Sequence, residues 1–426
     1  MVNSVSQSLI KYSPLLQPMA MVRDHIIHRM DTAFEQGVTV VANILKGYPE
    51  FAPYAFDVAM CMEEKGNKQA ADKIRKIAVE VIRVSSPSPS INDPHFLTPP
   101  LTGKYPVGVK SFYVEDLNRN EKDLGHNTNR TRRLELNVHY PAIQNKEPAY
   151  KIDPNVEEIA FPNPLKKEKF DNLWTRSQPG LKPSTEEKFP IIIFSHGWGQ
   201  NHNDYQQIVE ELASHGYCVI SVNHPFSNFV TAHVGHYQDL RQLDEFGTLD
   251  EVHQKQKIAN EVMTNAKDIE FVIHQIKSGK IEDFESLLGE SVNSELIGVL
   301  GHSMGGAAAL QTCKDVPSVK AGINLDGRIF QSSEEKENVV AQPFLIVSAG
   351  GASIDPVIKE VREGWDELQR KNPSSSRVDI PHATHGDFTI VPLYVEREAE
   401  KANESYAEIT RATNKEILGF FNQHFK

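Results

Sequence analysis

The 426-residue sequence is poor in cysteine, with only Cys61, Cys218 and Cys313, and no two of them lie close together. An odd and scattered set argues against a disulfide framework and against a cysteine-built metal site. Long apolar runs are also missing, and without about 18 consecutive apolar residues no membrane-spanning helix is predicted. Lysine and arginine (45) are outnumbered by aspartate and glutamate (57), which gives a net charge of −12. A surface of that sign repels phosphate backbones, so we expect no nucleic-acid partner.

The first residues, 1–22, mix polar residues with prolines and lack the unbroken apolar stretch of a secretory signal peptide. A cytoplasmic location is therefore the default expectation, with export by a route that needs no such leader left open. His233 and His236 have the spacing of an HxxH pair, but no third ligand is spaced to complete a metal site. We expect neither a metal nor another cofactor, and the sequence gives no indication of the oligomeric state.

Composition divides the chain into three parts. Residues 1–85 carry apolar residues at helical spacings of three and four, such as Ile26 and Met30, which predicts a helical amino-terminal extension. Residues 86–106 are rich in proline and serine and are predicted to be a linker, because proline removes the backbone donor that a helix or central strand needs. Residues 107–426 are predicted to form one large α/β domain.

Within that domain, strand and helix patterns alternate. Residues 110–116 and 132–142 are predicted to form an antiparallel hairpin, and the polar residues 143–188 a long surface insertion. Further strands are expected at 189–196, 217–224, 295–301, 319–326 and 342–350, and helices at about 205–213, 256–278, 304–314, 355–370 and 403–424. These strands are apolar on both faces, which predicts a mostly parallel sheet with helices on both sides.

The sequence GHSMG at 301–305 lies between a predicted buried strand and a helix rich in small residues. That context is typical of a nucleophile elbow, a sharp turn that exposes a serine hydroxyl at the carboxyl edge of the sheet. Gly301 and Gly305 are needed because neighbouring backbone must come very close to the turn. Ser303 is therefore the predicted nucleophile.

Acyl transfer at such a serine also needs two fixed N–H donors for the developing oxyanion. Met304, the residue after the nucleophile, is predicted to supply one. The loop after the strand at 189–196 reads His196-Gly197-Trp198-Gly199, and its glycines allow the N–H of Trp198 to point into the site. His196 could instead act as the catalytic base; we prefer the backbone role because the base of this fold comes near the end of the chain.

A serine nucleophile needs a base, and the base needs a carboxylate to orient it. His382 and His385 both follow the last predicted strand. Asp326 ends the first strand after the nucleophile helix, and Asp355 follows the next strand. Position alone leaves both pairs open.

Several segments together resemble the platelet-activating-factor acetylhydrolase family. They are FSHGWGQNHNDYQQIVEELASHGYCVISVNHP, GHSMGGAAALQT, AGINLDG and HGDF, and the resemblance spans about residues 107–425. Members of that family are α/β-hydrolases that cleave short or oxidised acyl chains from phospholipids without calcium. The resemblance implies Asp326 as the acid, His385 as the base and Trp198 as the second oxyanion donor. Trp198 is a departure, because the family has an aliphatic residue there, and this change bears on the shape of the acyl pocket.

Residues and resemblance together predict a serine carboxylic ester hydrolase that works through a Ser-His-Asp triad and an acyl-enzyme. Its substrate would be a small-molecule or lipid ester, and a lipid substrate implies peripheral contact with a membrane. GHSMGG also occurs in polyester- and cutin-degrading hydrolases, so a polyesterase or another carboxylesterase on the same fold is the alternative. A third hypothesis is a non-catalytic interaction protein whose amino-terminal helices bind a partner.

Overall fold

A computed structural model describes residues 73–74, 99–121, 130–143, 150–151, 174–227, 250–329, 340–350, 356–390, 392 and 399–425. The chain divides into two compact units, residues 1–88 and 89–426. Lys73 and Ile74 are the described residues of the first unit, and both are helical. The remainder of the predicted amino-terminal extension lies outside the described residues, as do residues 86–98 of the predicted linker. The predicted boundaries at residues 85 and 106 therefore stay predictions.

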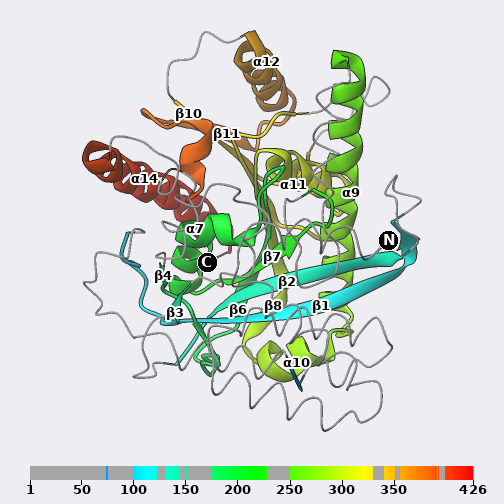
Figure 1. Ribbon diagram of the computed structural model, residues 1–426, viewed down its shortest axis with the longest axis vertical. Coiled ribbons are helices and arrows are strands. Elements are labelled where there is room, and N and C mark those ends of the chain that lie inside the picture. The colour runs from blue at the N-terminus through cyan, green and yellow to red at the C-terminus, as the bar shows by residue number, and fades with distance from the viewer. Residues whose placement is uncertain are drawn as a thin grey trace, which may run out of the picture. The chain divides into compact units, whose positions relative to one another are not determined.

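The second unit is built on a nine-stranded sheet with the strand order β11-β10-β9-β8-β6-β7-β2-β1-β5 (Figure 1). The strands are β1 (Val107–Asn120), β2 (Thr131–Pro141), β5 (Gln178–Pro179), β6 (Phe189–Ser195), β7 (Cys218–Asn223), β8 (Val292–His302), β9 (Ala321–Leu325), β10 (Phe344–Ala349) and β11 (Ser375–Ile380). β2 pairs antiparallel with both β1 and β7, whereas the pairs from β7 through β6, β8, β9 and β10 to β11 are all parallel. A mostly parallel sheet with this order confirms the predicted α/β-hydrolase fold.

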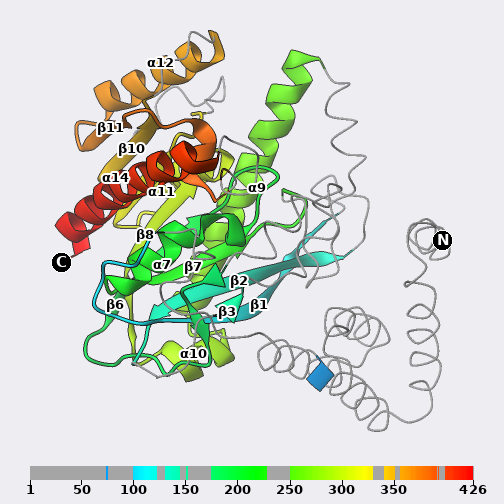
Figure 2. The ribbon, with the colours of Figure 1, turned by 60° about the vertical axis from the view of Figure 1, so that its left-hand side comes forward.

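The apolar strands bury both faces of the sheet under helices. Ile191 and Ile193 of β6 pack in one core cluster, and Ile192 and Phe194, which point the opposite way, pack in the other. The first cluster is covered by α9 (Glu251–Lys277), α10 (Glu282–Leu288), α11 (Met304–Asp315) and α12 (Pro356–Lys371), and the second by α7 (Gln206–Ser214) and α14 (Ala399–Phe425) (Figure 2). Burying such a side chain contributes about 1.5–3 kcal/mol, so alternation along one strand holds both helical layers to the sheet.

Three elements differ from the sequence prediction. α10 and β11 were not predicted, and β11 is an edge strand whose residues are mostly half-exposed, so it lacks the apolar run of its neighbours. The predicted surface insertion 143–188 is partly integrated into the body at its carboxyl end. There β5 pairs with β1, Leu181 is buried, and the Tyr140 hydroxyl donates to the Leu181 carbonyl at 2.8 Å. The remaining short strands, β3 (Tyr150–Lys151) and β4 (Trp174–Thr175), form a separate antiparallel pair.

Two helices of the described chain, α9 and α14, have 27 residues each. Length alone would let such a helix cross a bilayer, which needs about 20 apolar residues. Both helices are amphipathic instead: Ile269 and Val272 of α9 and Ile417 and Phe421 of α14 are buried in the two core clusters. Among the helices that the structure describes, none is both long enough and apolar enough to span a membrane.

Candidate active site

Ser303 stands alone between the end of β8 and the start of α11, with φ 56° and ψ −120°. A residue other than glycine rarely adopts a backbone conformation with positive φ. This conformation costs on the order of 1–3 kcal/mol and persists only where the surrounding structure holds it. The Ser303 N–H donates to the Leu325 carbonyl at 2.9 Å. A Cβ on Gly301 would lie 2.1 Å from the Gly305 carbonyl oxygen, and one on Gly305 would lie 2.2 Å from the Ser195 carbonyl oxygen. The turn therefore admits only glycine at 301 and 305.

One further predicted residue, His385, contacts the Ser303 side chain, and a second, Asp326, contacts His385. His385 Nε2 lies 2.9 Å from Ser303 Oγ, and His385 Nδ1 lies 2.7 Å from Asp326 Oδ2. Asp326 follows β9 at φ 53°, and its other carboxylate oxygen accepts the Ala349 N–H at 2.9 Å. A carboxylate only accepts, so the proton of a neutral His385 lies on Nδ1 and leaves Nε2 free to accept from the serine hydroxyl.

The structure also separates the two histidine candidates. His382 lies in the turn after β11, is solvent-exposed and has φ 63°, whereas His385 is the one that meets both Ser303 and Asp326. Asp355 lies outside the described residues. The group brought together is thus Ser303, Asp326 and His385, with the His385 side chain 54% exposed and the Asp326 side chain 13% exposed.

His385 begins a short 3-10 helix, η5 (His385–Phe388), that is fixed on both sides. The Asp387 carboxylate accepts the Thr384 N–H at 2.6 Å and the Thr384 hydroxyl at 2.7 Å. These two bonds close the turn that contains His385. Gln207 of α7 donates to the Phe388 carbonyl at 3.0 Å, and Phe388 is buried in the core. The loop that carries His385 is therefore anchored to the body of the domain.

The loop after β6 is held against the amino end of α11. The Gly199 N–H donates to the Ser227 carbonyl at 2.8 Å, and the Gly197 N–H donates to the Tyr205 hydroxyl at 2.9 Å. The Trp198 side chain packs, together with Ile258 of α9, against a small apolar cluster of Val262, Met304 and Ala307. Met304 is the first residue of α11, and the N–H groups of a first helical turn have no partner within the helix.

His196 is wholly buried and bonded to backbone at both ring nitrogens. Its Nε2 accepts the His224 N–H at 3.0 Å, so its Nδ1 carries the proton and donates to the Gly197 carbonyl at 2.8 Å. Burial and the neighbouring His224 lower the pKa of His196 well below its ordinary value. Neither nitrogen is available to Ser303, so the structure does not support His196 as a base.

Comparison with known proteins assigns the chain to a family. Residues 90–424 match the sequence model of the family described as platelet-activating factor acetylhydrolase, isoform II. The chain belongs to this family. The matched segment covers the sheet, its helices and all the predicted site residues, and it begins close to the start of the second compact unit at residue 89.

The individual relatives that match this member of the acetylhydrolase family have low sequence identity to it. A platelet-activating factor acetylhydrolase from the dog, Canis lupus familiaris, is 26% identical over 253 residues, which cover 52% of this chain and 53% of the relative. A bis(hydroxyethyl) terephthalate hydrolase from Streptomyces coelicolor is 34% identical over 97 residues, covering 22% and 29%. A solved ferulic acid esterase from Streptomyces cinnamoneus matches with a TM-score of 0.61 and 25% identity, covering 76% of this chain and 92% of the esterase. The chain spans about half the length of the first curated relatives it matches.

In this member of the acetylhydrolase family, His302 links the two loops of the site, a role that sequence reasoning missed. Its Nε2 lies 3.0 Å from the His385 carbonyl oxygen, which can only accept, so Nε2 carries the proton. Burial and the neighbouring His385 lower the pKa of His302 well below its ordinary value. The ring is therefore neutral, and its Nδ1 is an acceptor that lies 2.9 Å from the Tyr205 hydroxyl, whose one proton also faces the Gln200 side-chain oxygen. Because Tyr205 also accepts the Gly197 N–H, one line of hydrogen bonds runs from Gly197 to His385.

No metal site accompanies this arrangement in the part of the chain that the structure describes. There, no three His, Cys, Asp or Glu side chains are grouped so that they could hold an ion. His233 and His236, the HxxH pair, lie outside the described residues.

Proposed function

We propose that this chain is a serine ester hydrolase in which Ser303 is the nucleophile, His385 the base and Asp326 the orienting acid. The observation that carries the proposal is the line of hydrogen bonds from Asp326 through His385 to Ser303, at 2.7 and 2.9 Å. It lies at the carboxyl edge of a parallel sheet, beside the amino end of a helix, where this fold places its active sites.

The first chemical step forms an acyl-enzyme. Ser303 Oγ attacks the ester carbonyl carbon while His385 Nε2 takes the hydroxyl proton, and the ionised Asp326 stabilises the imidazolium that results. The carbonyl π electrons move onto the oxygen, which becomes an oxyanion bonded to the N–H groups of Met304 and Trp198. Collapse of this tetrahedral intermediate breaks the bond to the alcohol, which leaves with the proton from His385.

The second step returns the enzyme to its starting state. Water takes the place of the alcohol, loses a proton to His385 Nε2 and attacks the acyl carbon. The same two N–H donors hold the second oxyanion, and its collapse releases the carboxylic acid while Ser303 regains its proton from His385. The cycle needs no group beyond the side chains and N–H groups of this chain.

For the substrate, we propose an ester with a short or modified acyl chain, such as one carried by a phospholipid. The apolar cluster next to the nucleophile, in which Trp198 and Ile258 pack against Val262, Met304 and Ala307, provides apolar side chains close to the attacking hydroxyl, which suits an acyl chain. Platelet-activating factor acetylhydrolases are among the relatives, which favours a lipid ester. Acting on such an ester would bring the protein into peripheral contact with a membrane surface.

A second candidate substrate class is a soluble aromatic or polymer-derived ester. The relative from Streptomyces coelicolor is named a bis(hydroxyethyl) terephthalate hydrolase, and the solved neighbour is a ferulic acid esterase. The chemistry at Ser303 would be the same for either class, and the two classes differ in the acyl and alcohol groups of the ester.

Reaction with a fluorophosphonate probe tests the catalytic assignment. The wild-type protein should be labelled at Ser303, and Ser303→Ala should lose labelling and about 10⁶ in kcat. Ser278→Ala is the matched control, because that serine hydroxyl caps the end of α9, where it lies 2.6 Å from the His274 carbonyl and 3.3 Å from that of Gln275. A folded wild-type protein that neither labels nor hydrolyses any ester would refute the proposal and favour a non-catalytic interaction protein.

A substrate panel then separates the two ester classes. We would compare kcat/KM on short-acyl phospholipids, on p-nitrophenyl esters of increasing chain length and on bis(hydroxyethyl) terephthalate. A preference for the phospholipids supports the lipid ester, and a preference for the terephthalate ester supports the alternative. Labelled Ser303 with no phospholipid turnover would overturn the lipid assignment while leaving the esterase assignment intact.

A further inference from the structure

A second serine, histidine and aspartate set lies inside the molecule, behind the loop that follows β6. Ser195 Oγ lies 2.9 Å from His224 Nε2, and His224 Nδ1 lies 2.8 Å from Asp268 Oδ2. The atoms are joined in the same order as in the candidate active site. All three residues are fully buried, at 0% exposure, so no substrate can reach them. Any role of this set is therefore inside the folded protein and not in contact with a substrate.

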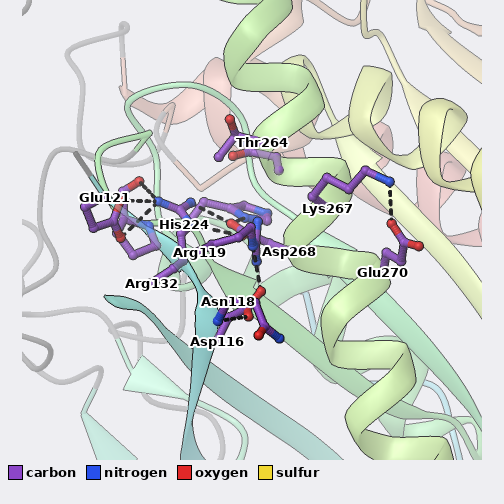
Figure 3. Close-up of polar contacts among 12 residues, drawn as sticks. Asp116, Asn118, Arg119, Glu121, Arg132, His224, Thr264, Lys267, Asp268 and Glu270 are labelled. Carbon is purple, nitrogen blue, oxygen red and sulfur yellow. Dashed lines mark hydrogen bonds and ion pairs between the residues drawn. The ribbon is translucent and has the colours of Figure 1, made fainter. Parts of the chain in front are cut away.

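Asp268 is held by two arginines from the antiparallel edge of the sheet (Figure 3). Arg132 of β2 donates from Nε to Oδ1 at 2.9 Å and from the terminal nitrogen to Oδ2 at 2.6 Å, and Arg119 of β1 pairs with Oδ1 at 2.8 Å. Burial alone would raise the pKa of Asp268, but Arg132, the hydrogen bond from His224 and Arg119 hold it well below its usual range. The carboxylate stays ionised and ties α9 to the two strands.

The ionised Asp268 sets the direction of both hydrogen bonds that the His224 ring makes. A carboxylate only accepts, so His224 Nδ1 carries a proton and donates to Asp268. Burial lowers the pKa of His224 although Asp268 raises it, and the ring is therefore neutral. Nε2 is then an acceptor, and the Ser195 hydroxyl donates to it.

A second path of hydrogen bonds leads from His224 to His196 and Gly197, the two residues that follow Ser195. The His224 backbone N–H donates to His196 Nε2, and His196 Nδ1 donates to the Gly197 carbonyl at 2.8 Å. The carbonyl of Gly197 and the N–H of Trp198 belong to one planar trans peptide and point in opposite directions. Fixing the Gly197 carbonyl therefore fixes the direction of the Trp198 N–H.

We propose that Arg132, Asp268 and His224 form a buried positioning unit that aims the Trp198 N–H at the oxyanion. The inference rests on the proposed function, because it assigns the unit to the second oxyanion donor of that reaction. None of the three residues is catalytic: they act through Ser195 and His196 on the peptide between Gly197 and Trp198.

Asp268→Asn is the variant that tests the unit. An amide offers one acceptor and one donor where Arg132 and His224 both need an acceptor, so the tautomer of His224 and its bond to Ser195 are disturbed. Loss of one oxyanion donor costs about 10²–10³ in kcat, so a donor that is displaced but present should cost about 10- to 100-fold. KM should stay within about 2-fold, because the donor acts on the transition state rather than on the bound ester.

The control is a second buried carboxylate that has no bond to this loop. Glu210 of α7 is 1% exposed and accepts the backbone N–H of Ser177 at 2.9 Å. Glu210→Gln should change stability while kcat per active site stays that of the wild type. The active fraction of each variant is counted by stoichiometric fluorophosphonate labelling, so that loss of folded protein is not read as loss of kcat.

Two readouts separate positioning from general damage to the fold. The kinetic pKa in the pH profile of kcat should be unchanged in Asp268→Asn, because the pair of Asp326 and His385 is untouched. The double variant Asp268→Asn with His224→Asn should lose no more kcat than the worse single variant, since both act along one path. Ser195→Ala is the mild variant for the case that Asp268→Asn does not fold, with an expected loss of about 2- to 10-fold in kcat for one hydrogen bond.

The outcomes are distinguishable. If the wild type labels and hydrolyses esters while folded Asp268→Asn and Ser195→Ala both keep wild-type kcat, the positioning unit is refuted and the esterase assignment stands. Losses that simply multiply in the double variant, or a shifted kinetic pKa, would also overturn the inference. A wild type without labelling or turnover refutes the proposed function on which the inference rests.

Discussion

Gly305 is a position where a single methyl group should harm the site severely. It lies in the first turn of α11, against the loop that carries Trp198. A Cβ at this residue would lie 2.2 Å from the Ser195 carbonyl oxygen and 2.5 Å from that of His196. Ordinary van der Waals contact begins at 3.4 Å, so Gly305→Ala must push helix and loop apart by more than 1 Å.

That displacement separates the two predicted oxyanion donors, because Met304 lies on the helix and Trp198 on the loop. A misplacement of about 1 Å costs on the order of 10² in rate, and overpacking a close contact costs about 1–3 kcal/mol of unfolding free energy. We therefore expect Gly305→Ala to lose about 100-fold in kcat while it remains folded. The carbonyl groups that it meets are backbone, so no side-chain rotation can relieve the clash.

The assay measures kcat per labelled active site together with the free energy of unfolding in urea. Gly419→Ala is the matched control, because a Cβ there has no atom within 4 Å and the residue lies inside α14, away from both of its ends. It should keep wild-type kcat and gain about 0.5–1 kcal/mol of stability, since alanine restricts the unfolded chain more than glycine does. A Gly305→Ala protein with wild-type kcat would show that the contact does not position the oxyanion donors.

Two further outcomes follow from the site and its buried histidines. Asp326→Asn should lower kcat by about 10⁴, because an amide favours the wrong tautomer of His385, whereas Asp355→Asn should have little effect; the reverse result would reassign the acid. Burial and the neighbouring His202 lower the pKa of His139 to about 3, and burial lowers those of His196 and His302 as well. As the pH falls below about 6.5, the unfolded chain binds protons that these folded histidines do not bind, so the free energy of unfolding should fall, by up to about 1.4 kcal/mol per pH unit for each histidine. Urea unfolding between pH 7 and pH 5 measures this slope, and a flat profile would contradict it.

Local pattern predicted the elements that are buried on both faces. β6 and β7 read as unbroken apolar runs, and the turn at Ser303 shows its glycines in the sequence, so each was recognisable without a partner. β11 was missed because an edge strand needs no apolar run, and α10 because a helix of seven residues gives too short a period. An element that carries its own apolar residues can be recognised from its sequence, whereas an element that depends on contacts with neighbouring segments cannot.

For the site, too, the local motif was predictable and the long-range pairings were not. Spacing pointed to Ser303 but left His382 with His385, and Asp326 with Asp355, undecided; the family resemblance favoured His385 and Asp326. Nothing in the sequence indicated that Asp268 would meet Arg132, which lies 136 positions earlier. Such pairings depend on how the strands and α9 come together, and only coordinates reveal them.

The hidden trio behind β6 matters for how hydrolases are recognised from geometry. Among the residues that the structure describes, a search for Ser, His and Asp side chains by mutual distances alone would find both sets, the one at Ser303 and the one at Ser195. Solvent access tells the two apart: the imidazole of one reaches bulk water, while the other is sealed under strands and a helix. A geometric template that matches the Asp–His–Ser hydrogen bonds but ignores solvent accessibility would therefore identify the buried set at Ser195 as an active site.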